Sequence, residues 1–176
     1  MKRFALVLAT LLTASSARAQ EEPAPDPAPP DRIFFSLDGG YAYQNVYSTG
    51  INAIDFSAVF GGELTRAFAV AAIVELARGW TEYGLTTTTI DLSPLFEGHY
   101  ERFRFGGGPH LGIIDVGRAT GRGFLGSPGA GIFARTSFDL ITFNEGHGAF
   151  FLVGKASADY VGTGLYGATV GLGVRF

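Results

Sequence analysis

The chain has 176 residues, no cysteine and a formal net charge of -3, and only 16% of its residues are charged although 47% are hydrophobic. A soluble domain usually has roughly a quarter of its residues charged, so this composition is unusual for one. The lack of cysteine excludes thiol catalysis and disulfide bonds. The acidic net charge provides no basic surface for nucleic acid, which we exclude as a partner. No stretch approaches the roughly 20 consecutive apolar residues that a transmembrane helix needs.

The N-terminus has the organisation of a secretory signal peptide. Lys2 and Arg3 form a positively charged start, residues 4–12 form a short apolar core, and Ala17-Arg18-Ala19 is a cleavage site of the small-x-small type. The apolar core is too short to span a membrane. We therefore expect residues 1–19 to be a signal peptide that is removed on export.

Residues 20–32 are rich in proline and acidic residues. Proline removes backbone donors and keeps the chain extended, so this segment predicts a semi-rigid, solvated periplasmic leader and no strand. We assign residues 33–176 to a single domain.

From Ile33 onward, apolar residues alternate with small or polar ones, which is the period of a half-buried strand. Eight such segments follow one another. About 144 residues at roughly 10–12 per strand, plus connections, also give eight strands, and strand number is even in bacterial single-chain barrels. We therefore expect an all-β protein, an eight-stranded antiparallel up-and-down transmembrane β-barrel with both termini on the periplasmic side.

Nearly every charge within the strands falls on one parity, and the bulky apolar residues fall on the other. We expect the bulky parity to face lipid and the charged parity to face the lumen. An eight-stranded barrel is just filled by its inward side chains, and charges in so narrow a space must pair. The sequence therefore predicts an occluded lumen with a polar network formed by Asp38, Asp55, Glu63, Glu75, Asp91, Glu97, Arg104, His110, Arg135, Asp139, Lys155, Asp159 and Arg175.

The connections between the expected strands alternate in length. Short turns are expected at residues 64–67, 98–101 and 141–148, and longer loops at residues 44–53, 79–87 and 115–127. Short periplasmic turns and longer outer loops are typical of outer-membrane barrels.

Aromatic residues gather near the two expected ends of the strands, as amphipathic rings do at the two lipid–water boundaries. The outer girdle would contain Tyr41, Tyr43, Trp80, Tyr83, Phe124, Tyr160 and Tyr166. The inner girdle would contain Phe34, Phe35, Phe68, Phe96, Tyr100, Phe103, Phe143, Phe150 and Phe176.

The last expected strand alternates without interruption and ends on an aromatic residue. Its apolar positions are Tyr166, Ala168, Val170, Leu172, Val174 and Phe176. In this pattern the chain resembles the small outer-membrane barrels of the OmpA and OmpX type. The resemblance implies residence in the outer membrane, lipid and lipopolysaccharide as surroundings, and an assembly machinery that reads an assembly signal formed by Tyr166, Val170, Leu172, Val174 and Phe176.

The residues do not form a catalytic, cofactor-binding or metal-binding motif. The favoured function is a non-enzymatic, monomeric barrel with a structural or surface-interaction role through its outer loops. A narrow channel or small-ligand carrier is the alternative, and a lipid A-modifying enzyme is a third. Arg118 and Arg122, in the longest expected loop, are candidate contacts for lipopolysaccharide phosphates, which match guanidinium geometry.

For the enzyme alternative, the position of the histidines matters. His99 and His147 are expected in inner turns, away from the outer leaflet. His110 is expected on the upper, inward side of a strand, with Asp91 opposite or diagonal to it as the carboxylate of a general-base pair. No serine is placed convincingly beside it, so a structural histidine is favoured.

Overall fold

The computed structural model describes residues 32–46, 48–82, 84–118, 126–143, 148–160 and 164–176. Its eight strands form one closed antiparallel barrel in which each strand pairs with its neighbours in the sequence and β1 pairs with β8. The strands are β1 (Arg32–Val46), β2 (Thr49–Thr65), β3 (Phe68–Trp80), β4 (Leu85–Tyr100), β5 (Phe103–Arg118), β6 (Ser127–Phe143), β7 (Gly148–Tyr160) and β8 (Gly164–Arg175). The predicted fold class is confirmed. The expected signal peptide and nearly all of the leader lie outside the described residues.

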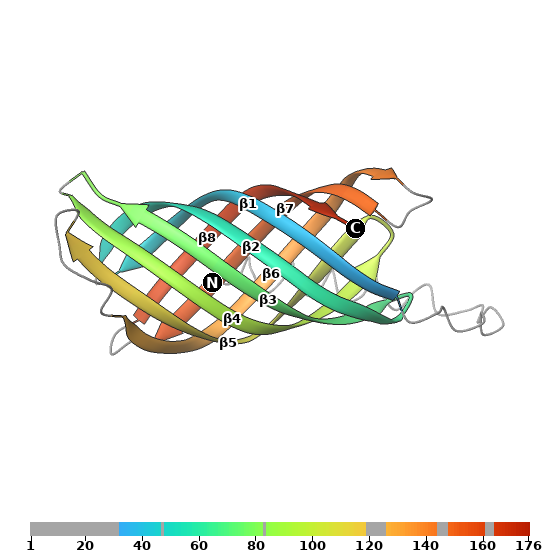
Figure 1. The fold of residues 1–176 in the computed structure, drawn as a ribbon, viewed down its shortest axis with the longest axis horizontal. Coiled ribbons are helices and arrows are strands. Elements are labelled where there is room, and N and C mark those ends of the chain that lie inside the picture. The colour runs from blue at the N-terminus through green and yellow to red at the C-terminus, as the bar shows by residue number, and fades with distance from the viewer. Residues whose placement is uncertain (1–31, 47, 83, 119–125, 144–147, 161–163) are drawn as a thin grey trace, which may run out of the picture.

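The strands wind obliquely around a common axis (Figure 1). We call the end where β1 begins and β8 ends the terminal end; it also carries the turns β2–β3, β4–β5 and β6–β7. The opposite end, with the remaining four connections, is the loop end. The shortest strand has 12 residues, which exceeds the 9–11 that a tilted strand needs to cross a bilayer.

The two faces of the wall differ as the alternation predicts. Large apolar side chains cover the outside, and several are more than half exposed, among them Phe56, Phe60, Leu111, Ile132, Val170 and Leu172. The inside holds the buried polar and charged side chains. Within the described part of the chain, no helix has both the length and the hydropathy of a membrane span.

The connections at the loop end are shorter than predicted. β1 continues to Val46 and β2 begins at Thr49, so most of the loop expected at 44–53 is strand. β3 reaches Trp80 and β4 begins at Leu85, which likewise shortens the loop expected at 79–87. The second segment contains small inward residues such as Gly79 and Thr87, which are buried in the strands and fit a narrow lumen. Bulges occur on the terminal side, between Glu63 and Thr65 and between Asp139 and Ile141.

The interior also contains two apolar clusters. The wall cluster lies on β1–β4 and consists of Phe34, Val59, Ala69, Ala71, Ile73 and Leu95, with Phe133 packed against it. The loop-end cluster consists of Val46, Ile51, Ile114 and Leu165. Phe34, expected in the inner girdle, is therefore an inward residue; its exposed neighbour Phe35 takes the lipid-facing position. The interior therefore contains apolar packing as well as charged side chains.

Glycines bring β1 and β8 together at the seam that closes the barrel. Gly40 lies opposite Gly171. An ideal Cβ at Gly40 would lie 2.3 Å from the Val170 carbonyl oxygen, and one at Gly171 would lie 2.4 Å from that of Gly39. At the terminal end of the same seam, Phe35 and Phe176 exchange backbone hydrogen bonds of 3.0 and 2.8 Å. The last residue thus completes the β1–β8 ladder.

Candidate functional site: the polar lumen

The terminal end of the lumen holds a cluster of four polar residues from three strands. Arg104 Nη2 lies 3.2 Å from Glu63 Oε1, and Arg104 Nη1 lies 3.4 Å from Glu97 Oε1. His99 Nε2 lies 3.2 Å from Glu97 Oε1. The guanidinium of Arg104 also lies 5.7 Å from the centre of the Phe34 ring. His99, expected in a turn, is an inward member of this network, because β4 continues to Tyr100.

Arg135 connects this cluster to the middle of the barrel. Its Nη1 lies 3.1 Å from Glu97 Oε2, and its Nη2 lies 3.1 Å from Asp38 Oδ2. The side chains of Arg135, Glu97 and Asp38 are at most 4% exposed. These contacts cross the lumen from β6 to β4 and β1, so one guanidinium ties three strands together.

Lys155 is the centre of the mid-barrel network. Its Nζ lies 2.7 Å from Asp55, 3.0 Å from Glu75 and 3.2 Å from Asp38. Ser57 donates a hydrogen bond of 2.6 Å to Asp38. Asp55 is fully buried, and its Oδ1 has no hydrogen-bond donor among the described residues. The charge of Asp55 is therefore balanced by Lys155.

A separate ion pair lies on the side of the lumen near β8. Arg175 Nη2 lies 2.5 Å from Asp139 Oδ2. The guanidinium groups of Arg175 and Arg135 lie 5.7 and 5.4 Å from the centre of the buried Phe151 ring. A cation over an aromatic face is favourable, so Phe151 joins the two parts of the network.

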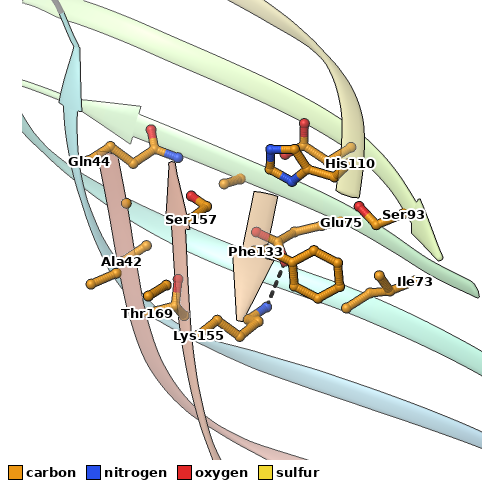
Figure 2. A pocket seen from close by; sticks show the side chains of 15 residues that line it. Ala42, Gln44, Ile73, Glu75, Ser93, His110, Phe133, Lys155, Ser157 and Thr169 are labelled. Carbon is orange, nitrogen blue, oxygen red and sulfur yellow. Dashed lines mark hydrogen bonds and ion pairs between the residues drawn. The ribbon is translucent and has the colours of Figure 1, made fainter. Parts of the chain in front are cut away.

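Between the mid-barrel network and the loop-end cluster lies a polar cavity, shown in Figure 2. His110 hydrogen-bonds Asp159, and its ring stacks on Phe133 with centroids 6.1 Å apart. Asp91 also lines this cavity and lies diagonal to His110, as expected, because it is paired with Gly112, but the hydrogen-bond partner of His110 is Asp159. Asp91 leans over Gly112 on β5, where its carboxylate occupies the space of a Cβ.

The cavity is small. It has a volume of about 30 Å³, and a second one of about 30 Å³ adjoins it toward the loop end, sharing Gln44, Glu75, Asp91, Ser157 and Gly167. A water molecule needs roughly 10–15 Å³ measured in this way, so each cavity accommodates a few waters at most. The carboxylates that line the two cavities are Glu75, Asp91 and Asp159, and the basic residues that line the first cavity are Lys155 and His110.

The cavity residues do not assemble a hydrolase arrangement. A nucleophile must hydrogen-bond its base, but Ser157 hydrogen-bonds Asp159, the carboxylate that His110 already contacts. Among the described residues, no group of three or more His, Asp or Glu side chains is arranged to hold a metal ion. The polar side chains of the cavity are instead engaged with one another, as in the hydrogen bond between His110 and Asp159.

The structure brings together nearly all the residues of the predicted network. Each of its four Arg and Lys residues contacts at least one carboxylate, whereas Asp91 forms no ion pair with any described residue. Arg118 ends β5 at the loop end; Arg122 and His147 lie outside the described residues. Arg78 is an exposed cation on the outer face of β3 near the loop end and was not among the predicted site residues. Its position in the alternation, on the parity of the lipid-facing residues, is the signal that could have identified it.

The comparisons identify the fold. No protein-family model matches the sequence, and no curated protein matches it significantly. The crystal structure of Neisserial surface protein A (NspA) is similar with a TM-score of 0.56 and 13% identity, over 84% of this chain and 98% of that one. The crystal structure of Ail, the attachment invasion locus protein of Yersinia pestis, is similar with a TM-score of 0.54 and 13% identity, over 81% of this chain and 98% of that one. The chain thus has the fold of the small eight-stranded outer-membrane barrels, as its resemblance to the OmpA and OmpX type implied.

Proposed function

We propose that this protein is an integral outer-membrane β-barrel with a closed lumen, that it is not an enzyme, and that it acts in envelope structure or surface interaction through its loop end. One observation carries the proposal. The wall is apolar outside and ion-paired inside, the reverse of a soluble barrel. The fold supports the same location.

The outer face supports residence in a bilayer. Ile132, Leu172 and Phe56 are 67%, 62% and 60% exposed in the isolated chain. A contiguous apolar surface of this extent is unfavourable in water. In a bilayer, the closed hydrogen-bond ladder also gives the backbone polar groups partners within the protein, except at one interruption between β4 and β5. The terminal end then faces the periplasm and the loop end faces outward.

The interior supports a closed lumen. Ion pairs run from Glu63 through Arg104, Glu97, Arg135 and Asp38 to Lys155. The wall cluster fills one side of the lumen, and the loop-end cluster fills one end. The cavities between them hold only a few waters, so these contacts favour a structural barrel over a channel.

The loop end supports contact with the outer leaflet. Arg78 lies between Ile54 and Thr88 on the outer face, two residues before exposed Trp80. An exposed guanidinium at this level is placed to bind a lipopolysaccharide phosphate, and Arg118 ends β5 at the same end of the barrel. The surface role has support from the neighbours: NspA is described as a surface protein, and Ail was solved in complex with the heparin analogue sucrose octasulfate.

Topology and location can be tested together in cells. An epitope inserted after Gly84, at the loop end, should bind antibody on intact cells, whereas the same epitope inserted after Arg102, in the β4–β5 turn, should bind only after permeabilisation. Both variants should fractionate with the outer membrane and migrate differently before and after heating. Recovery of the protein in the soluble fraction would contradict the proposal.

The lipid contact and the absence of catalysis need separate measurements. Arg78→Gln should weaken binding of purified lipopolysaccharide, while Arg102→Gln, at the opposite end, should leave it unchanged. Lipid A mass spectra from cells with and without the gene should be identical. A new lipid A species that disappears in a His110→Asn variant would establish the enzyme alternative instead.

A further inference from the structure

The wall of the barrel has one interruption in its described strand pairing besides the two bulges near the turns. β4 and β5 pair continuously to Leu92 opposite Leu111, and the pairing resumes only at Phe96 opposite Gly107. Extending the same register across the gap places Pro94 directly opposite Pro109. Both prolines keep their partners on the other side, Ala72 on β3 and Ile132 on β6.

Two prolines facing each other remove two hydrogen bonds. Proline has no backbone N–H. Because the pairing of β4 with β3 and of β5 with β6 is uninterrupted at the prolines, both ring nitrogens must face the gap between β4 and β5. The carbonyls of Pro94 and Pro109 therefore lack the donors that an antiparallel pair would give them. The strands still approach closely here, since an ideal Cβ at Gly108 would lie 2.2 Å from the Pro94 carbonyl oxygen. The seam is closed but not hydrogen-bonded.

Two hollows lie beside the unbonded seam, one on each face of β4. On the inside, Ser93 and His110 flank the prolines and line the polar cavity (Figure 2). On the outside, Pro94 borders an apolar groove of about 550 Å³, whose other walls include Phe60, Ala72 and Leu92. Ser93 borders both hollows, so the wall between them is one strand thick at this position.

The chemistry of the two hollows defines the molecule that fits them. The groove is apolar and open along one side, which suits an alkyl chain. The seam offers hydrogen-bond acceptors, and an unsatisfied carbonyl in lipid is costly. The cavity behind it is lined by Glu75, Asp91, His110 and Lys155. Lys155 is ion-paired with Glu75 and His110 hydrogen-bonds Asp159, so Asp91 and the carbonyls are the acceptors that remain, and they favour a donor. The complementary ligand is a single-chain amphiphile with a neutral or cationic hydrogen-bond donor, an alcohol or amine, at its head.

We propose that the β4–β5 seam at Pro94 and Pro109 is a lateral portal, through which such an amphiphile from the surrounding membrane places its head at the Pro94 carbonyl and its chain in the outer groove. This inference rests on the proposed function, because the groove meets membrane lipid only if the barrel spans a bilayer. Separating β4 from β5 at residues 93–95 breaks no ladder hydrogen bond, because these three residues have no pairing with the described residues of β5. Separating any other pair of described strands at mid-barrel would break such bonds.

The chain has no cysteine, so single cysteines can report access from the lipid phase. In vesicles, a decyl-chain maleimide should label Ser93→Cys about tenfold faster than Ser137→Cys. The reason is that opening the β4–β5 seam breaks two fewer ladder hydrogen bonds than opening a continuous ladder. Ser137 is the matched control, since it is equally inward and buried but lies in continuous ladders on both sides. Dodecanol or dodecylamine should slow the labelling of Ser93→Cys, and laurate should not.

A second experiment closes the portal by restoring the missing backbone donors. Pro94→Val with Pro109→Val restores both donors and should lower the Ser93→Cys labelling rate to that of Ser137→Cys. Ala72→Cys, in the outer groove, should label rapidly in every background, which reports insertion and folding. Equal rates for Ser93→Cys and Ser137→Cys in the parent barrel would overturn the portal. A failure of Ala72→Cys to label in that same barrel would instead contradict the membrane location on which the portal rests.

Discussion

Replacing Lys155 with methionine should destabilise the barrel by about 3–5 kcal/mol, the range for removing one partner of a buried ion pair. Methionine keeps much of the length of the side chain and removes the ammonium that lies within 3.2 Å of Asp38, Asp55 and Glu75. The perturbation is therefore electrostatic and not a cavity.

The three carboxylates contribute unequally to this loss. Asp38 keeps Arg135 at 3.1 Å and the Ser57 hydroxyl at 2.6 Å. Glu75 borders the water-sized cavity, and its side chain is 26% exposed. Asp55 is fully buried and loses its sole ion-pair partner among the described residues. Most of the destabilisation should therefore come from Asp55, and the double variant with Asp55→Asn should recover a large part of it.

The assay is equilibrium unfolding in urea from lipid vesicles, followed by the fluorescence of Trp80, the single tryptophan of the chain. Arg102→Met is the control, because it removes an exposed cation and should change the free energy of unfolding by less than about 0.5 kcal/mol. If Lys155→Met unfolds at the parent urea concentration, the ion pairs do not hold the lumen together. If Asp55→Asn adds to the loss instead of reversing it, the proposed origin in Asp55 is wrong.

Three further perturbations test the faces and the closure of the barrel. Leu172→Arg, in the middle of the lipid face, should cost about 2–4 kcal/mol in vesicle unfolding, whereas Leu64→Arg, near the terminal end, should cost about 0–1 kcal/mol; equal costs would contradict the assigned depth. Phe151→Ala should cost about 3–5 kcal/mol by opening a buried cavity, while outward Phe150→Ala should cost much less, and the opposite order would reverse the assigned faces. Deleting Phe176 should lower the yield of heat-modifiable barrel, because Phe35 loses two backbone hydrogen bonds at the closing seam, and unchanged yield would show that the last aromatic residue is dispensable.

Strand number and facing could be predicted because the signal is local. In β1, the alternation of Phe35, Leu37 and Tyr41 with Ser36 and Asp38 appears in the sequence and again in the observed exposures. A period of two needs no knowledge of the neighbouring strand, so this prediction does not depend on register. The outward position of Ile132 and Leu172 follows in the same way.

The partners across the lumen could not be predicted, because they depend on how far each strand is displaced along its neighbours. His110 contacts Asp159 on β7 although Asp91 lies closer in the sequence. Arg135 reaches Asp38 across 97 positions. The apolar packing inside could not be predicted for another reason. Inward Phe34 precedes outward Phe35, and inward Phe151 follows outward Phe150. A Phe-Phe pair in the sequence does not indicate which ring faces inward.

Steady conductance of the purified protein in planar bilayers tests the central claim most directly. A barrel closed by the Lys155 and Arg135 ion pairs and by both apolar clusters should show no steady conductance above the bare bilayer. A reproducible single-channel conductance from correctly folded, heat-modifiable protein would contradict the closed lumen and establish a channel in its place.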